Sequence, residues 1–369
     1  MTERAHPYIT GPRRLPGLDG IRGIAILLVV VSHAEMAGST MQAEWIARLG
    51  DLGVKLFFVL SGFLITTLLL QEQSRTGRIA YGRFLVRRAF RILPAAYAFI
   101  LCVIGASMLG WITLQPGDAL HALTYTAEFG APSWWIGHLW SLSIEEQYYF
   151  VWPLVLGLVR PRLGAWLMAG TLVVAAVARG AIVLWLADYS EGIERSFIAA
   201  IDGFAMGGLL AALLPALERR LGYLRALKSP WAPLLLPAAA ALDQLEHHPL
   251  IFYVVLQSVV YLLLALWLHR SQVVTNDWSA RVLNLRGLSW LGTISYSLYL
   301  WQQPFLAPQS IRLVDSFPVA AGLSLLFALL SFHLIEKPFL RLRDRVVSAN
   351  VSSQRQVVAT ARSSVSGAP

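Results

Sequence analysis

Long continuous apolar runs, without alternation of apolar and polar positions, make up most of this chain. A bilayer core of about 30 Å needs about 20 apolar residues for each helical span. In lipid, only helices and closed barrels satisfy the backbone hydrogen bonds, and runs without alternation favour helices. The sequence therefore predicts an all-α, polytopic integral membrane protein with about ten transmembrane helices, at residues 18–37, 52–71, 91–111, 142–159, 164–186, 197–216, 231–242, 250–268, 288–306 and 318–336.

The composition agrees with a membrane environment. Charged residues make up 14% of the chain and hydrophobic residues 56%, whereas soluble domains average about 25% charged residues. The net charge is +9, but the basic residues stand between the apolar runs and form no separate basic module. We therefore expect the lipid bilayer as a partner and no nucleic acid. Cys102 is the single cysteine, which excludes an intrachain disulfide.

The basic residues also predict an orientation. If the first segment is cytoplasmic, 25 of the 30 Lys and Arg residues fall in cytoplasmic segments and three on the opposite side. The positive-inside rule then places both termini in the cytoplasm, with the helices in the inner cell membrane. We expect a cytoplasmic N-terminal segment at 1–17, a transmembrane domain at 18–340 and a disordered cytoplasmic tail at 341–369.

The first apolar helix carries three ionisable residues. Arg22 and His33 are eleven positions apart, which is three helical turns plus about 20°, so they share one face about 16 Å apart along the axis. Asp19 lies one turn before Arg22, within reach of an ion pair. Asp19 and Arg22 could simply anchor the helix, and a lone histidine is often a packed core residue. Ionisable groups within a membrane are costly, however, and histidine is a common general base.

A second cluster is "WSLSIEEQYYFVWP", residues 140–153. A carboxylate opposite a histidine orients the imidazole and stabilises its protonated form. Alternatively, Glu145 and Glu146 could stabilise a helix N-terminus through the helix dipole. For Glu145 we favour a catalytic role, with its carboxylate orienting His33, and for Glu146 both interpretations stay open.

A third cluster is "RFLVRRAFRILPAAY", residues 83–97. Arg88 and Arg91 lie one helical turn apart, and six arginines fall between residues 71 and 91. The planar guanidinium group suits phosphate because it donates two hydrogen bonds at once. An ordinary positive-inside loop would explain any single arginine, but the density of the cluster favours a phosphorylated cytosolic ligand.

Other residues have supporting roles in this interpretation. Ser61 precedes Gly62 where helices are expected to pack closely, and Asp202 is a carboxylate among glycines in the sixth predicted span. Lys55, near one end of the second span, is expected to snorkel to the interface. The sequence contains none of the common hydrolase, zinc or nucleotide-binding motifs, so we expect no metal site.

Six blocks, taken in order along residues 18–340, resemble acyltransferase family 3, the integral-membrane acyl transferases of bacteria. They are "LDGIRGIAILLVVVSH", "GVKLFFVLSGFLI", "RRAFRILPAAY", "WSLSIEEQYYFVWP", "SYSLYLWQQP" and "SFHLIEKPF". The resemblance implies a fold of about ten spans, an acyl-CoA donor and a hydroxyl or amine acceptor. By the same resemblance, Arg22, Arg88 and Arg91 bind the acyl donor, and His33, Glu145 and Glu146 are catalytic.

One departure from the family pattern concerns the ninth predicted span. Family members often have a histidine in "LYLWHxP", where this chain has Gln302 and Gln303. The resemblance therefore implies that His33 acts without a second histidine at that place.

The resulting hypothesis is transfer of an acyl group, acetyl in the first instance, from cytosolic acyl-CoA to an acceptor hydroxyl. His33 acts as general base or as acyl carrier. Acyl-CoA (acetyl-CoA) is a co-substrate, and no permanently bound cofactor is expected. The acceptor is a hydroxyl-bearing glycan, a lipid-linked sugar or a secondary metabolite. Two other classes stay open: a proton-coupled transporter or flippase in which His33, Glu145 and Asp202 relay protons, and a scaffold or receptor.

Overall fold

In the computed structural model, residues 17–36, 43–130, 132–185, 193–245, 249–306 and 317–346 are described. Those residues form helices and connecting turns, and no strand occurs among them. The described part of the chain is all-α, as predicted. Its helices are α1 (Leu18–Met36), α2 (Glu44–Ala47), α3 (Leu49–Thr76), α4 (Tyr81–Met108), α5 (Asp118–Thr124), η1 (Ala127–Phe129), α6 (Trp134–Gly137), α7 (Leu139–Leu158), α8 (Pro161–Trp185), η3 (Ile193–Arg195), α9 (Phe197–Leu217), α10 (Leu221–Leu227), η4 (Ala232–Leu234), α11 (Leu235–Asp243), α12 (Pro249–Ile251), η5 (Phe252–Leu256), α13 (Gln257–Val273), α14 (Trp278–Leu283), α15 (Arg286–Phe305), α16 (Phe317–Ser331) and η6 (Phe332–Glu336).

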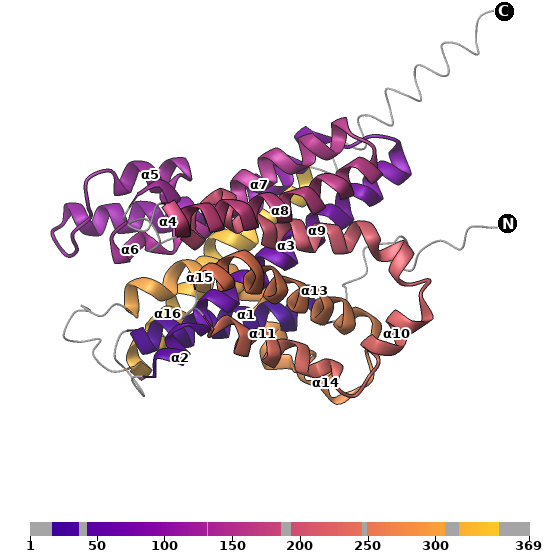
Figure 1. Cartoon of the computed structure of the whole chain (residues 1–369). Helices are drawn as coiled ribbons and strands as arrows, with labels where there is room; N and C mark the ends of the chain where they lie inside the picture. The colour runs from indigo at the N-terminus through magenta and orange to yellow at the C-terminus, as the bar shows by residue number, and fades with distance from the viewer. Residues whose placement is uncertain are drawn as a thin grey trace, which may run out of the picture.

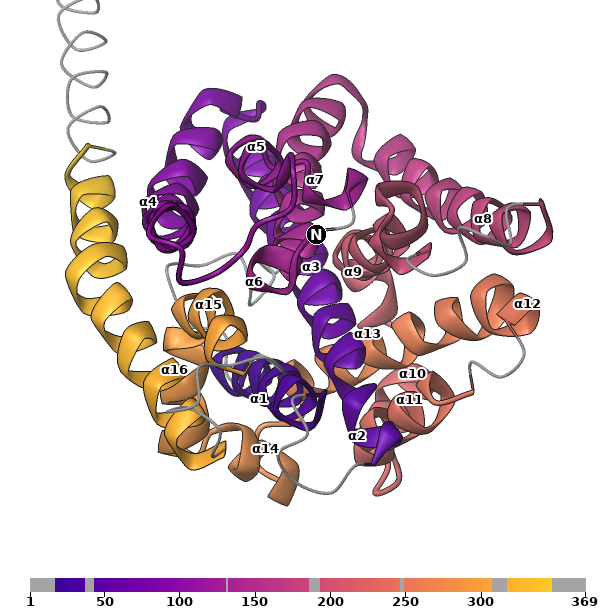
Figure 2. The same cartoon turned by 90° about the vertical axis from the view of Figure 1, so that its left-hand side faces the viewer.

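The long helices run in broadly the same direction, with the short helices α2, α5 and α6 at one end and α10 at the other (Figure 1). Seen from the α2 end, α1 and α15 lie next to each other beside α3, with α4 and α16 on one flank and α8 and α12 on the opposite flank (Figure 2). The two ends of this bundle are therefore lined by different connecting segments.

Within the described part of the chain, six helices are long and apolar enough to cross a membrane. They are Glu44–Thr76, Tyr81–Met108, Pro161–Trp185, Phe197–Leu217, Pro249–Val273 and Phe317–Val346. The chain is thus a multi-pass membrane protein. Helices α1, α7 and α15 have 19 or 20 residues, about 30 Å at 1.5 Å per residue, but carry more polar groups. The count of ten spans stays a prediction.

The predicted span at 231–242 differs most from the structure. This segment forms η4 and then α11, which has nine residues and is about 14 Å long, well short of a bilayer core. Pro233 lies in the first turn of this segment and Pro237 in the third position of α11, so the apolar run does not form one long helix.

Glycines allow the central helices to approach backbone to backbone. On the α1 and α15 pair, a Cβ at Gly292 would overlap the carbonyl oxygen of Asp19. On the α3 and α9 pair, a Cβ at Gly62 would overlap the carbonyl oxygen of Phe204, and one at Gly207 the carbonyl oxygen of Val59. Close packing at Gly62, predicted from the sequence, is confirmed. These contacts fix the helices that hold the polar site.

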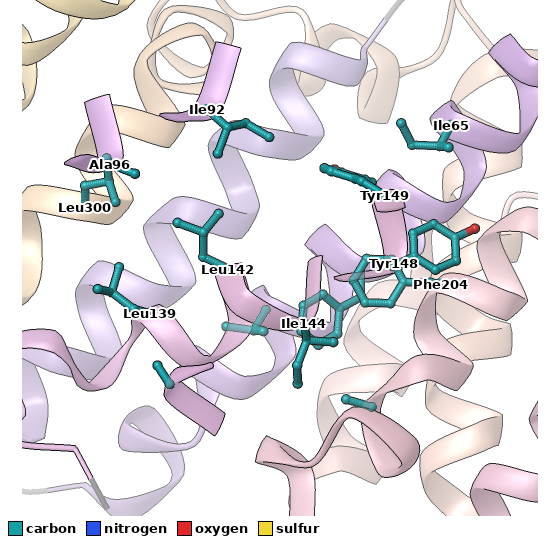
Figure 3. Packing of buried hydrophobic residues seen from close by; sticks show 14 of the residues in the cluster. Ile65, Ile92, Ala96, Leu139, Leu142, Ile144, Tyr148, Tyr149, Phe204 and Leu300 are labelled. Carbon is teal, nitrogen blue, oxygen red and sulfur yellow. The ribbon is translucent and has the colours of Figure 1, made fainter. Parts of the chain in front are cut away.

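The apolar core fills the space between α4, α7, α9 and α15. Ile92 of α4, Leu142 of α7 and Leu300 of α15 all belong to one buried cluster (Figure 3). Tyr148 of α7 stacks on Phe204 of α9 with ring centroids 4.6 Å apart. Dense packing of this kind holds α7 in place, and with it the polar residues on its other face.

Two buried ion pairs join helices away from this cluster. Lys55 Nζ lies 2.7 Å from Asp243 Oδ1, and both side chains are buried. Lys55 therefore does not snorkel, because α11 supplies a carboxylate partner within the protein. Arg179 of α8 lies 2.7 Å from Asp202 of α9, and neither side chain is exposed. A charge in lipid needs such a partner, and Asp202 finds it here.

The predicted terminal segments fall mostly outside the described residues. Of the N-terminal segment at 1–17, only Gly17 is described. Of the tail predicted at 341–369, residues 341–346 are helical and continue the last long helix as far as Val346. Residues 347–369 lie outside the description.

Candidate active site

Helix α1 places the three ionisable residues that the sequence singled out. Asp19 and Arg22 lie in its first two turns, and Arg22 Nη1 donates to Asp19 Oδ1 at 3.2 Å. The predicted ion pair is confirmed. His33 lies three turns further along α1, so the helix holds the arginine and the histidine at two separate depths.

Arginines surround a cavity of about 930 Å³ at the end of the bundle where α3 ends and α4 begins. We call it the arginine cavity. Arg22, Arg88 and Arg91, the three predicted donor-binding residues, all line it. Its other arginines are Arg75, Arg87 and Arg343. The structure thus brings together α1, α3, α4 and the last helix around a strongly basic hollow suited to a polyanion.

A narrow passage of about 100 Å³ adjoins the arginine cavity. Arg22, Arg88 and Arg91 line both spaces. The passage also contains the Glu145 carboxylate, whose Oε1 accepts hydrogen bonds from the Ser61 hydroxyl at 2.5 Å and from the Tyr149 hydroxyl. The guanidinium of Arg88 lies over the Tyr149 ring, 4.6 Å from its centroid. The passage therefore carries hydrogen-bonding groups along an otherwise apolar wall.

His33 lines a third cavity, of about 740 Å³, which we call the histidine chamber. Its wall includes His138, which lies between α6 and α7, and the aromatic side chains Trp134 and Trp140. Charged groups also line it, namely Glu44, Arg48, Asp51 and Arg195. A chamber with both aromatic and charged walls can hold a polar ligand with an apolar face.

The three cavities follow one another through the protein. The arginine cavity and the passage share the three predicted arginines, and the passage and the histidine chamber share Val54 and Tyr299. Tyr299 is held in place because its hydroxyl lies 2.5 Å from Ser141 Oγ and donates to the carbonyl oxygen of His138 at 2.9 Å. A row of spaces therefore leads from the arginines to His33.

The imidazole of His33 contacts Gln302 of α15. Nδ1 of His33 lies 2.7 Å from Oε1 of Gln302, whose side chain is fully buried. An amide oxygen can only accept, so Nδ1 carries the proton and Nε2 keeps its lone pair. The ring also meets Trp134 edge-on at 5.5 Å. In this arrangement His33 has one fixed tautomer with a basic nitrogen available.

The structure separates some residues that the sequence analysis placed together. Glu145 lines the passage and bonds Ser61 and Tyr149, while Gln302 occupies the position beside His33 that we predicted for Glu145. Glu146 lines none of these three cavities, and its Oε1 is buried without a hydrogen-bond partner among the described residues. Helix α7 begins at Leu139, so neither glutamate lies in its first turn as a cap would.

Sequence reasoning missed two side chains of the site. His138 lies two residues before Trp140, where the "WSLSIEEQ" block begins, and its place near that block was the available signal. Tyr299, in "SYSLYLWQQP", gave no signal beyond its membership of a matched block. Asp202 lines none of the three cavities and is paired with Arg179, in keeping with a supporting role. Within the described ranges, no three His, Cys, Asp or Glu side chains cluster as metal ligands.

Comparison with known proteins identifies the class of this protein. The family model described as an acyltransferase domain matches residues 15–335, nearly the whole chain. The chain therefore belongs to the acyltransferase 3 family, and it is a membrane acyltransferase.

Two relatives illustrate this similarity. YrhL of Bacillus subtilis (strain 168), a proposed peptidoglycan O-acetyltransferase, is 30% identical over 379 residues, covering 88% of this chain and 55% of that protein. The O-acetyltransferase OatA of Staphylococcus aureus (strain NCTC 8325 / PS 47) is 28% identical over 365 residues, covering 89% of this chain and 57% of that protein. The chain thus spans a little over half the length of these relatives. No solved structure shows a significant match to it.

Proposed function

We propose that this protein transfers an acetyl group from acetyl-CoA to a hydroxyl group of a glycan or another hydroxyl-bearing acceptor. The observation that carries this proposal is the row of three spaces from Arg22, Arg88 and Arg91 to His33. The names of the relatives support O-acetyl transfer, and the name of YrhL supports a glycan acceptor. A lipid-linked sugar or a secondary metabolite fits the same hydroxyl chemistry.

The donor enters from the arginine cavity. Phosphate groups of acyl-CoA bind the guanidinium groups of Arg22, Arg88 and Arg91 through paired charge-assisted hydrogen bonds. The cavity volume of about 930 Å³ leaves room for the nucleotide part of the donor. Because most of the basic residues lie in segments predicted to be cytoplasmic, we place the arginine cavity on the cytoplasmic face of the inner cell membrane.

The pantetheine arm occupies the narrow passage. Its length suits the axial separation of about 16 Å between Arg22 and His33 on α1. Both hydrogen bonds to Glu145 reach Oε1, so the other carboxylate oxygen accepts an amide N–H of the arm. In this proposal Glu145 binds the donor, and Ser61 and Tyr149 hold the carboxylate in position. Glu146 has no assigned step.

Transfer takes place in the histidine chamber. The acceptor hydroxyl gives its proton to Nε2 of His33, and its oxygen attacks the thioester carbon. A carbon–oxygen bond forms, the carbon–sulfur bond breaks, and the proton passes from His33 to the departing thiolate, giving free CoA thiol and the ester. Holding both substrates in one chamber supplies much of the rate. His33 Nε2 could also take up the acetyl group first, and the same tautomer serves both routes.

The proposal is tested by thiol release from acetyl-CoA by the purified chain in lipid nanodiscs with a panel of sugar acceptors. We expect His33→Ala to reduce the turnover by about 10²–10⁴-fold, the usual contribution of a general base. His333→Ala, which removes an exposed histidine of the last long helix, is the matched control and should leave turnover unchanged.

Two outcomes would contradict this function. Unchanged acetyl transfer in the His33→Ala variant would remove His33 from the reaction. Absence of thiol release with every donor and acceptor, together with acceptor flux across proteoliposomes, would favour the transporter class instead.

A further inference from the structure

A second histidine shares the chamber with His33 and has no role in the reaction as derived so far. His138 lies between α6 and α7 and is 3% exposed. Within the described part of the chain, neither of its ring nitrogens has a hydrogen-bond partner. The carbonyl of Leu300 approaches the ring without reaching hydrogen-bond geometry. A buried imidazole without a partner is unusual, because desolvation of its polar atoms is not offset within the protein.

The ring of His138 is nevertheless firmly held. Phe99 and Tyr299 meet it edge-on, with ring centroids 5.4 Å and 5.3 Å away. Its own backbone carbonyl accepts hydrogen bonds from the hydroxyls of Tyr299, at 2.9 Å, and Ser141, at 3.2 Å. Packing and backbone contacts thus fix the residue while its polar ring atoms stay unused. This combination is typical of a group prepared for a ligand.

The position of His138 specifies which part of a ligand it would meet. Tyr299, on which His138 packs, lines both the passage and the histidine chamber. His138 therefore lies on the side of the chamber nearest the passage. Under the proposed function, on which this inference rests, the thioester group of the donor emerges at this point.

We propose that His138 is a second catalytic histidine, a neutral imidazole whose N–H donates a hydrogen bond to the thioester carbonyl oxygen. A buried imidazole without a carboxylate partner is most stable in its neutral form, which carries one N–H. As the acceptor oxygen attacks, negative charge develops on the carbonyl oxygen, and a preorganised donor stabilises it. His138 keeps its proton throughout, and the proton transfer still runs from acceptor to His33 to thiolate.

A purely structural role for His138 makes a different prediction. Its neighbours Phe99 and Tyr299 form an aromatic pocket, and a phenylalanine ring would fill the same volume without leaving a polar atom unpaired. If packing alone matters, His138→Phe should fold well and keep full activity. If the N–H matters, the same variant should fold well and lose activity.

The test compares three variants of the full chain in nanodiscs with acetyl-CoA and the best sugar acceptor. His138→Phe removes the donor, His138→Gln keeps a side-chain N–H, and His333→Phe is the matched control. We expect His138→Phe to lower kcat by about 10²–10³-fold, as for loss of one oxyanion donor, with the KM values for both substrates nearly unchanged. His138→Gln should retain a larger part of kcat, and His333→Phe all of it.

A spectroscopic measurement adds a readout that packing would not change. With acetyl-CoA labelled with ¹³C at the thioester carbonyl, a hydrogen bond from His138 lowers the stretching frequency of the bound carbonyl relative to free donor. We expect the shift in the wild type and in the His33→Ala variant, and its loss in His138→Phe.

The possible results separate this inference from the proposed function. Full kcat and an unchanged carbonyl frequency in a folded His138→Phe variant would overturn the role of His138 while leaving acetyl transfer intact. A wild-type chain that neither binds acetyl-CoA nor releases thiol would overturn the proposed function itself. A loss of kcat in His138→Phe with the carbonyl shift retained would also reject His138 as the donor to that oxygen.

Discussion

At the scale of single residues, the partner of His33 determines how the imidazole works. Gln302 is neutral and fully buried, and its oxygen faces Nδ1 of His33 at 2.7 Å. Its Nε2 lies 3.5 Å from the carbonyl oxygen of Tyr299, which places the amide oxygen on the histidine side. A neutral amide selects the tautomer of His33 without adding a negative charge to the site. Gln302 therefore acts on the reaction through His33, as a positioning residue.

Replacing Gln302 by leucine tests this positioning role. Gln302→Leu keeps a similar size but removes the acceptor, so Nδ1 no longer has a fixed partner. We expect kcat for acetyl transfer to fall about 10- to 100-fold, as for loss of a partner that orients a functional histidine. Gln302→Glu keeps an acceptor oxygen and should retain more activity.

The control for this prediction is Gln244→Leu, at the C-terminal end of α11 and outside all three cavities. It should leave kcat unchanged. An equally active Gln302→Leu variant would show that the tautomer of His33 is fixed by something else.

Helical spacing within one element was enough to predict part of the site. Asp19, Arg22 and His33 follow from the periodicity of α1 alone, and the ion pair between Asp19 and Arg22 is confirmed. The partner of His33 could not be found in this way, since residues 33 and 302 meet only through the packing of α1 on α15. A sequence motif indicates residues that share a function, but it does not show which of them are in contact. For this reason the motifs alone led us to pair His33 with Glu145.

At the scale of helices, glycines decide how closely the central helices pack. The α3 and α9 pair meets through Gly62 and Gly207, each against a backbone carbonyl of the other helix. This contact lies beside Ser61, which holds Glu145 in the passage. The spacing of these two helices therefore affects both stability and the shape of the passage.

A methyl group at Gly62 should be enough to disturb this helix pair. The added Cβ of Gly62→Ala would overlap the carbonyl oxygen of Phe204, and backbone cannot rotate away as a side chain can. We expect a loss of about 1–3 kcal/mol of stability from overpacking, seen as a lower Tm in detergent. Gly170→Ala in α8, where a Cβ meets nothing within 4 Å, should keep or raise the Tm. Equal Tm values for the two variants would contradict close packing at Gly62.

The existence of the long helices could be predicted well, but their ends could not. The third predicted span begins at 91, whereas α4 begins at Tyr81. An apolar run marks the part of a helix that meets lipid, and the hydrogen-bonded helix extends beyond it through the arginine cluster. At 231–242 the same criterion overestimated the length, because two prolines and a short run yield a helix of nine residues.

At the scale of the whole molecule, the two ends of the bundle differ in chemistry. The arginine cavity lies where α3 ends and α4 begins, and the histidine chamber lies towards α2 and α6. The short helices α2 and α6 both lie at the same end of the bundle (Figure 1). The phosphates of the donor would bind at one end of the bundle, and its thioester would react near the other end. The flexible pantetheine arm would then run along the helices between the two ends.

This arrangement predicts that donor binding can be weakened without affecting the acceptor. In the double variant Arg88→Ala plus Arg91→Ala, two guanidinium groups are lost from both the arginine cavity and the passage. Charge-assisted hydrogen bonds contribute about 1.5–3 kcal/mol each, so the KM for acetyl-CoA should rise at least about tenfold. The KM for the acceptor, which binds in the histidine chamber, should change little.

The control is Arg160→Ala plus Arg162→Ala, which removes two exposed arginines at the start of α8 and outside the three cavities. Equal increases in the KM values for acetyl-CoA and for the acceptor in the Arg88 and Arg91 variant would instead indicate damage to the fold. The phosphate site is local, so its loss alone should not weaken the binding of an acceptor that lies beyond Tyr299.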